Sequence, residues 1–340
     1  MTNDLYLDSG YLNMKNIWKN KCPYTWLLGG RGCGKTYGVI KVLLEMKKKF
    51  IYMRRTDKQI ELSCTPKMSP FKKINADLGR NIVPIKEKEF VYFREGEAEI
   101  ALGAALSTFY NLRGVSLEDY DIILFDEVIP EIMERTRSGE GRAMLEAYET
   151  INRNRELFGK PPLRCFFCGN TDTLNSDILR AYGIIGILEY MIPKGKEVYI
   201  NRETGHAVYN LYKSPISLAK ADTALYRATQ NKAFKDKALN NIFTDLRDSK
   251  DIKYIPLAEC KIFCNIDNEI GVYEHKANEY FYVCAKTNSG GKTFHMVNTS
   301  ERKSFARTYG AILRDAIDAE RIYYDSFQTK SAVESYLFNY

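Results

Sequence analysis

The stretch GGRGCGKT at residues 29–36 decides the fold, because it satisfies the pattern G-x-x-x-x-G-K-[ST] of a phosphate-binding loop. The apolar run YTWLL (24–28) precedes it and predicts a short buried strand. After the loop, apolar residues recur on one face of a helix that we expect from about residue 35 to residue 48. A strand, a glycine-rich turn and a helix in this order are the context that such a loop requires.

Each residue type in this loop has a chemical reason. Glycines let successive backbone N–H groups point at phosphate oxygens, and the start of the helix adds its dipole. We expect Lys35 to reach the β- and γ-phosphates of ATP, and the Thr36 hydroxyl to ligate Mg²⁺. The predicted nucleotide-binding residues are therefore Gly29, Gly30, Arg31, Gly32, Cys33, Gly34, Lys35 and Thr36.

An acidic pair follows a second apolar run. DIILF (121–125) predicts a strand covered on both faces, and Asp126 and Glu127 come directly after it. We expect Asp126 to hold Mg²⁺ together with Thr36, and Glu127 to orient or deprotonate the attacking water. The adjacent glutamate favours hydrolysis over a P-loop kinase, which must exclude water. The kinase stays an alternative.

Asn170 ends a further buried strand, LRCFFCG (163–169), and is expected to contact the γ-phosphate or its water. A plain turn asparagine is the competing interpretation. Within this strand Cys165 and Cys168 are three positions apart, so they face opposite sides and are badly placed to share a zinc ion. We interpret both as core cysteines.

Strands alternate with helices through the first half of the chain, which predicts an α/β fold with a mainly parallel sheet. Further strands or hairpins are expected at 50–55, 89–106 and 195–212, and a helix at 140–157. Two more β-hairpins are predicted after residue 255, turning near Asp267–Asn268 and near residues 289–291, with helices at 304–318 and 330–338. We expect a P-loop ATPase domain at 1–195, a hairpin and helical linker at 196–229, and a smaller α/β domain at 230–340.

Composition fits a globular protein, with 45% hydrophobic residues and a net charge of +7 that leans mildly towards polyanionic partners. Eight scattered cysteines and a polar beginning without a signal peptide favour a reducing cytoplasm. No apolar run is long enough to predict a membrane-spanning helix.

Several motifs in order carry a family resemblance. These are GGRGCGKT, FIYMRR (50–55), NLRG (111–114), DIILFDE (121–127), NRNRE (152–156) and RCFFCGN (164–170). The chain resembles the DNA-packaging ATPases of phi29-like tailed phages over residues 11–175. These ATPases are relatives of the large terminases and of the additional-strand P-loop translocases.

The resemblance implies a homomeric ring of five subunits that acts in the host cytoplasm at the portal (connector) of a procapsid. Such a ring hydrolyses ATP with Mg²⁺ and drives double-stranded DNA inward, and a structural RNA is a further possible partner. Arg153 matches the family's arginine that acts on the neighbouring subunit, and Arg113 matches a basic residue that acts across the same interface. Arg153 and Arg155 also suit the end of a helix, where positive charges complement the helix dipole.

The C-terminal part resembles a ribonuclease-H-like nuclease domain that has lost its metal site and binds nucleic acid or the portal. A terminase-type ATPase with a live nuclease is an alternative, with candidate carboxylates Asp267, Glu269, Asp315, Asp318 and Asp325. A helicase or other nucleic-acid translocase is a second alternative. DNA contacts should be to phosphates, although a solvated basic face would look the same in the sequence. The candidates for these contacts include Arg54, Arg55, Lys58, Lys67, Lys72 and Lys73.

Overall fold

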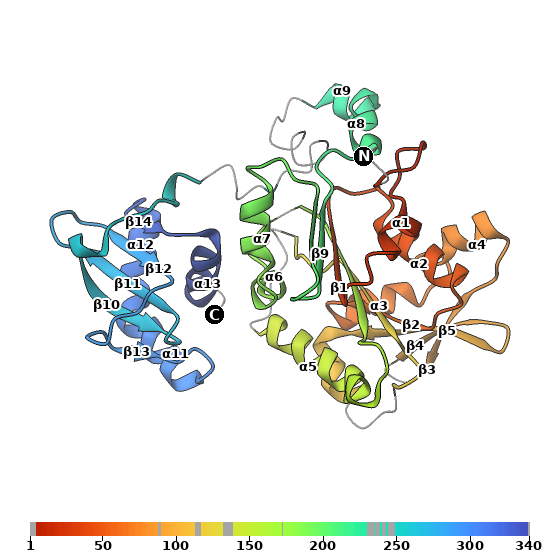
Figure 1. The fold of residues 1–340 in the computed structure, drawn as a ribbon, viewed down its shortest axis with the longest axis horizontal. Coiled ribbons are helices and arrows are strands. Elements are labelled where there is room, and N and C mark those ends of the chain that lie inside the picture. Colours follow the sequence, from red (N-terminus) through yellow and green to blue (C-terminus); the bar gives the residue numbers. More distant parts are fainter. Residues whose placement is uncertain are drawn as a thin grey trace.

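The structure is a computed structural model that describes residues 5–87, 90–112, 117–131, 139–171, 173–229, 235, 239, 243 and 249–338. It contains one sheet of nine strands and one of five (Figure 1). The chain builds the larger sheet first and the smaller sheet second, as the colours from red to blue show. This order matches the predicted α/β part followed by a smaller α/β part.

The nine-stranded sheet has the order β3-β4-β5-β2-β6-β7-β1-β9-β8. The strands from β5 to β9 in this order are mutually parallel, and antiparallel strands close both edges. The mainly parallel sheet predicted from the sequence is confirmed. Its strands are β1 (Tyr24–Leu28), β2 (Phe50–Arg54), β3 (Val83–Glu87), β4 (Phe90–Glu95), β5 (Ala98–Ala105), β6 (Ile122–Asp126), β7 (Arg164–Gly169), β8 (Val198–Asn201) and β9 (His206–Asn210).

Helices cover both faces of this sheet, because alternate strand residues are apolar on opposite sides. Trp26 and Cys165 pack on one face, and Leu27 and Cys168 on the other, so the two cysteines do face opposite sides. The first face is covered by α5 (Glu140–Asn152), α6 (Asp177–Ala181) and α7 (Ile184–Met191). The second face is covered by α1 (Met14–Trp18), α2 (Lys35–Glu45), α3 (Asp57–Ser63) and α4 (Lys72–Leu78).

The five-stranded sheet has the order β13-β10-β11-β12-β14 and is flanked by three helices. The hairpin of β10 and β11 turns at Asp267 and Asn268, as predicted, and both have a left-handed φ, of 50° and 56°. The bounds are β10 (Cys260–Ile266), β11 (Ile270–His275), β12 (Phe281–Cys284), β13 (Thr293–Phe294), β14 (Ile322–Tyr324), α11 (Thr299–Phe305), α12 (Ala311–Asp318) and α13 (Phe327–Phe338).

The second hairpin predicted in this region is wrong. β13 pairs with β10 in parallel and not with β12, which instead pairs with β14. The Asn265 side chain explains the difference, since its amide donates to the carbonyls of Asn288 and Gly291 at 2.8 and 3.0 Å. These bonds hold the loop against β10 and bring β13 to the outer edge of that strand. The ribonuclease-H likeness stays a prediction.

The predicted linker is partly incorporated into the larger sheet. Strand β9 lies beside β1, so the sheet continues past residue 195, and α8 (Pro215–Ala219) and α9 (Ala224–Ala228) follow it. Helix α13 packs against α6 and α7 (Figure 1), and the backbone N–H of Phe327 donates to Glu189 at 2.6 Å. The domain boundaries stay a prediction. Within the described residues, no helix is both long and apolar enough to cross a membrane.

Candidate nucleotide-binding site

The predicted phosphate loop runs from the end of β1 to the start of α2. Gly34 precedes the helix with a φ of 86°, a left-handed conformation that favours glycine. Lys35, only 8% exposed, points its ammonium back into the loop, where Nζ donates to the carbonyls of Gly29 and Gly30 at 2.7 and 2.8 Å. The loop therefore encloses a cation, as a site for phosphate groups requires.

Three neighbouring elements bring their polar ends to this loop. The Thr36 hydroxyl, at the start of α2, donates to Oδ1 of Asp126 at the end of β6, at 2.5 Å. Lys35 Nζ donates to Oδ1 of Asn170, just beyond β7, at 3.3 Å. A hydroxyl and a carboxylate side by side are the hard oxygen ligands that Mg²⁺ prefers, so the residues present fit this ion. The nucleotide and metal roles of these residues stay predictions.

Arg54 lies on the two carboxylates that the sequence singled out. Its Nη1 donates to Asp126 at 3.2 Å, and its Nη2 pairs with Glu127. These ion pairs hold the guanidinium at the acidic pair with only 16% of the side chain exposed, and the DNA contact of Arg54 stays a prediction. Strands β2 and β6 are adjacent in the sheet, which places the end of one beside the end of the other. The sequence does not give that strand order.

Glu127 has the surroundings of a general base. It follows β6 with a φ of 58°, a conformation that costs energy for a residue with a side chain and recurs at functional sites. Burial raises the pKa of Glu127 above its ordinary value, while Arg54 lowers it and the nearby Asp126 raises it. A raised pKa brings a carboxylate closer to the operating pH, where proton abstraction from water is efficient.

Arg55 faces the opposite way from Arg54 and is buried. Its guanidinium makes a bidentate ion pair with Glu140 in the first turn of α5, with Nη2 2.9 Å from Oε1 and Nε 3.1 Å from Oε2. Arg55 is only 2% exposed, and its DNA contact stays a prediction. Lys58, on α3, is exposed and stays a candidate.

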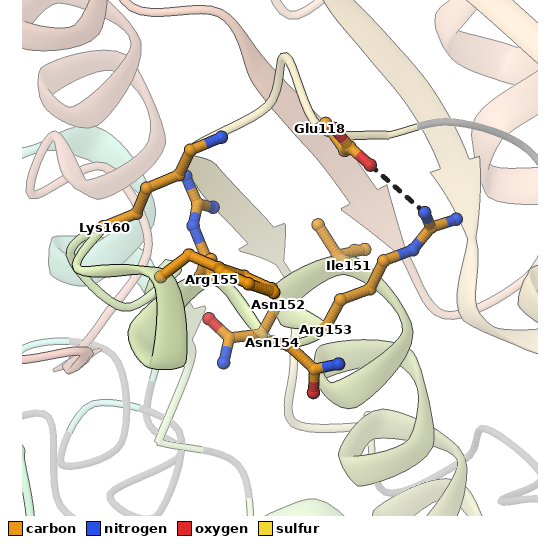
Figure 2. A pocket seen from close by; sticks show the side chains of 8 residues that line it. Glu118, Ile151, Asn152, Arg153, Asn154, Arg155 and Lys160 are labelled. Atoms are coloured by element: carbon orange, nitrogen blue, oxygen red, sulfur yellow. Dashed lines mark hydrogen bonds and ion pairs between the residues drawn. The ribbon is translucent and has the colours of Figure 1, made fainter.

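Arg153 lies near the amino ends of the parallel strands, whereas the phosphate loop lies at their carboxyl ends. Its Nη1 donates to Glu118 at 3.3 Å beside a cavity of about 360 Å³ that Arg155 and Lys160 also line (Figure 2). Arg155 pairs with Asp121, the residue before β6, whereas Asp126 ends that strand. At about 3.3 Å per residue these two ends are about 17 Å apart, beyond the reach of an arginine side chain.

Arg153 therefore cannot reach the phosphate loop of its own chain, and its action on a neighbouring chain stays a prediction. Its backbone φ of 45° is left-handed and places it at the end of α5, where the helix stops. Arg113, the second arginine predicted to act across an interface, lies outside the described residues.

A cavity of about 770 Å³ adjoins the loop, and apart from the loop glycines the sequence analysis did not identify the residues that line it. Gly32 and Gly34 form the side nearest the loop, and Tyr11, Met14 and Tyr37 supply apolar surface. The segment that precedes β1 had no residue that stood out in the sequence. Its closeness to the loop depends on tertiary packing, in which Tyr11 lies directly against Gly34.

Two of the five candidate nuclease carboxylates, Asp267 and Asp325, accept backbone hydrogen bonds. Asp267 accepts the backbone N–H of Met296 at 2.7 Å, and Asp325 accepts that of Ala285 at 2.8 Å. In the described ranges, no group of three or more metal-ligating side chains is close enough together to hold an ion. Asp315 and Asp318 are exposed on α12.

A parallel sheet with a phosphate loop between β1 and α2 and an acidic pair at the end of β6 defines the class of P-loop NTPases. Within that class, a model of the Podovirus DNA encapsidation protein (Gp16) family matches residues 7–171 of this chain. No curated protein matches the chain.

Two solved structures share the fold over nearly the whole length. A subunit of "The Phi-28 gp11 DNA packaging Motor" has a TM-score of 0.65 at 16% identity, covering 97% of this chain and 98% of that one. A subunit of "The bacteriophage Phi-29 viral genome packaging motor assembly" has a TM-score of 0.57 at 14% identity, covering 96% and 98%. The family resemblance predicted from the sequence motifs, to the phi29-like packaging ATPases, is confirmed.

Proposed function

We propose that this chain is an ATP-driven motor subunit that moves double-stranded viral DNA into a procapsid as part of a homomeric ring. One observation carries the proposal. The candidate nucleotide site lies at the carboxyl ends of the parallel strands in the nine-stranded sheet. Arg153 lies near their amino ends, too far away to act at the site of its own chain. Copies that meet head to tail bring these two edges together, and head-to-tail contacts that close generate rings.

The residues at the loop have separate roles in hydrolysis. Lys35 binds the β- and γ-phosphates, and Thr36 and Asp126 would hold Mg²⁺, which neutralises charge on those groups. Glu127 takes a proton from the attacking water, while Arg54 pairs with one of its two carboxylate oxygens, Oε2. Asn170 accepts a hydrogen bond from Lys35, and through this contact it transmits a change at the γ-phosphate to the end of β7.

The cavity beside the loop takes the base of the nucleotide. Its apolar lining, with Tyr11 and Tyr37, suits a planar aromatic ring, and its opening adjoins the loop that binds the phosphates. Polar side chains also line this cavity, among them Asn13, Lys41 and Asp77.

Arg153 of one copy stabilises the negative charge that develops on the phosphates bound to its neighbour. The other partners follow from the same proposal: double-stranded DNA, a ring of five copies, the procapsid portal and a structural RNA. Lys58, exposed on α3, is a DNA-phosphate contact in this scheme. Arg113 is proposed to act across the interface with Arg153.

The test is steady-state ATP hydrolysis by the wild type, Glu127→Gln, Arg153→Ala and a 1:1 mixture of the two variants. Each is measured with and without double-stranded DNA. Arg155→Ala, which removes a nearby arginine that is paired with Asp121, serves as the matched control. We expect DNA to stimulate the wild type, both variants to be inactive alone, and the mixture to regain activity.

The outcomes separate the parts of the proposal. Recovery in the mixture requires that Arg153 from one chain completes the site of another. Normal hydrolysis by Arg153→Ala would remove its role across the interface, and indifference to DNA would remove the motor. Strand separation by the wild type would favour a helicase instead. Mn²⁺-dependent cleavage that survives Lys35→Ala but is lost in Asp267→Ala would favour an ATPase with a live nuclease.

A further inference from the structure

A second lysine touches the phosphate loop, from a segment about 190 residues further along the chain. Lys220 follows α8, and its Nζ donates to the carbonyl of Arg31 in the middle of the loop. Lys220 Nζ also lies beside the next residue, since a Cβ added to Gly32 would be 2.9 Å from it. Neither the loop motif nor the acidic pair points to this residue.

The whole segment from residue 211 to residue 220 crosses the loop region. Leu211 donates its N–H to the carbonyl of Leu28 at 2.8 Å, and a Cβ on Gly29 would lie 2.6 Å from the Leu211 side chain. Further along, Ile216 lies against Gly10, beside the cavity described above. The position of Lys220 is therefore fixed by several contacts along this segment and not by one flexible side chain.

The two lysines at the loop differ in how their donors are used. An ammonium group has three N–H donors. Those of Lys35 are directed at the carbonyls of Gly29 and Gly30 and at the amide oxygen of Asn170. Lys220 has one such acceptor, the Arg31 carbonyl, and no carboxylate among the described residues pairs with it. Two of its N–H groups are thus available beside the middle of the loop.

We propose that Lys220 is a phosphate-binding residue of the nucleotide site, supplied by the segment that joins β9 to the smaller sheet. The inference rests on the proposed nucleotide-binding function. A phosphate oxygen held by the loop N–H groups takes the remaining donors of Lys220, and the ion pair adds to the contact of Lys35. The triphosphate thereby clamps residues 211–220 against the loop, and the segment that follows leads towards the C-terminal sheet.

The test is isothermal titration of MgATP into the full-length chain carrying Glu127→Gln, so that ATP is bound but turned over slowly. Lys220→Ala, Lys220→Gln and Lys220→Arg are compared in that background. Lys213→Ala is the matched control, because Lys213 lies in the same segment and is exposed, with its ammonium over the ring of Tyr212. The melting temperature of each variant is measured without nucleotide.

We expect Lys220→Ala and Lys220→Gln to raise the Kd for MgATP by roughly tenfold or more, the usual effect of losing a hydrogen bond to a charged group. Lys220→Arg should stay within about threefold of the parent chain, since the charge is kept. Lys213→Ala should bind as the parent does. The difference in Kd between the parent chain and Lys220→Ala should be smaller at high salt, because salt screens the ion pair.

The glutamine variant decides between binding and mere support of the loop. Its amide still donates to the Arg31 carbonyl but carries no charge. Parental affinity in Lys220→Gln, or in Lys220→Ala, overturns the proposal. If the Glu127→Gln parent itself binds no MgATP although Lys220 is intact, the proposed nucleotide-binding function fails, and the assignment of Lys220 fails with it. Gln and Arg variants keep a long polar side chain, so the comparison stands even where the alanine variant does not fold.

Discussion

Both sheets end a strand in an aspartate, but the surroundings of the two aspartates differ. Asp126, the last residue of β6, faces the Thr36 hydroxyl at 2.5 Å and the Arg54 guanidinium at 3.2 Å. Asp267, after β10, accepts a backbone N–H at 2.7 Å and the Tyr336 hydroxyl at 3.4 Å. The first aspartate is surrounded by charged and hydroxyl side chains from other elements, whereas the second mainly fixes the backbone of its own region. An acid at a strand end becomes a candidate for catalysis only through the groups that neighbouring elements bring to it.

The largest expected effect is on hydrolysis. Glu127→Gln should lower the rate of ATP hydrolysis by about 10² to 10⁴, the usual contribution of a general base, while leaving MgATP binding in place. Asp267→Asn should hydrolyse ATP at the wild-type rate, because its carboxylate lies in the other sheet. Both are measured as phosphate release under saturating ATP. Equal losses in the two variants would erase the contrast between the sheets.

The second effect is on stability. Glu140→Gln should lower the free energy of unfolding by about 3–5 kcal/mol, because it leaves the buried Arg55 charge without its ion pair. The measurement is urea denaturation at constant salt. Glu146→Gln, which breaks the exposed pair with Arg142 on the same helix, should cost well below about 1 kcal/mol. A small cost at Glu140 would mean that Arg55 finds water or another partner.

The third effect is on the pH profile of hydrolysis. Glu127 acts as a base only when deprotonated, and its pKa lies above the ordinary carboxyl range because of burial. Activity should therefore fall on acidification through that raised pKa. Arg54 lowers this pKa, so Arg54→Gln should move the acid limb of kcat to higher pH. Lys58→Gln should leave the limb unchanged, and a shift of the Arg54 variant to lower pH would contradict the assignment.

The smallest effect concerns the other aspartate. Tyr336→Phe removes the hydroxyl that donates to Asp267 and should cost about 1 kcal/mol of stability without changing ATP hydrolysis. Thermal unfolding and phosphate release on the same preparation measure both. A large loss of DNA binding or cleavage at wild-type stability would assign Asp267 a chemical role and reverse the comparison.

Much of the candidate site can be predicted from the sequence, because many of its residues are neighbours in the chain. The loop glycines, Lys35 and Thr36 are consecutive, and the apolar runs before Asp126 and Asn170 predict the strands that carry them. The carboxyl ends of parallel strands meet at one edge, so these residues were expected to be close, and they are. The hairpin that would have joined β12 to β13 failed because a side-chain amide, Asn265, holds that loop elsewhere.

The sequence by itself determined the loop, the acidic pair and the alternation that sends Arg54 and Arg55 to opposite sides. Only the tertiary structure decided what each arginine meets, because strand order arises from pairing between segments far apart in the chain. The order β5-β2-β6 places Arg54 on Asp126 and Glu127, and the packing of α5 places Glu140 on Arg55. The contact of Lys220 with Arg31, across the long intervening sequence, is decided in the same way.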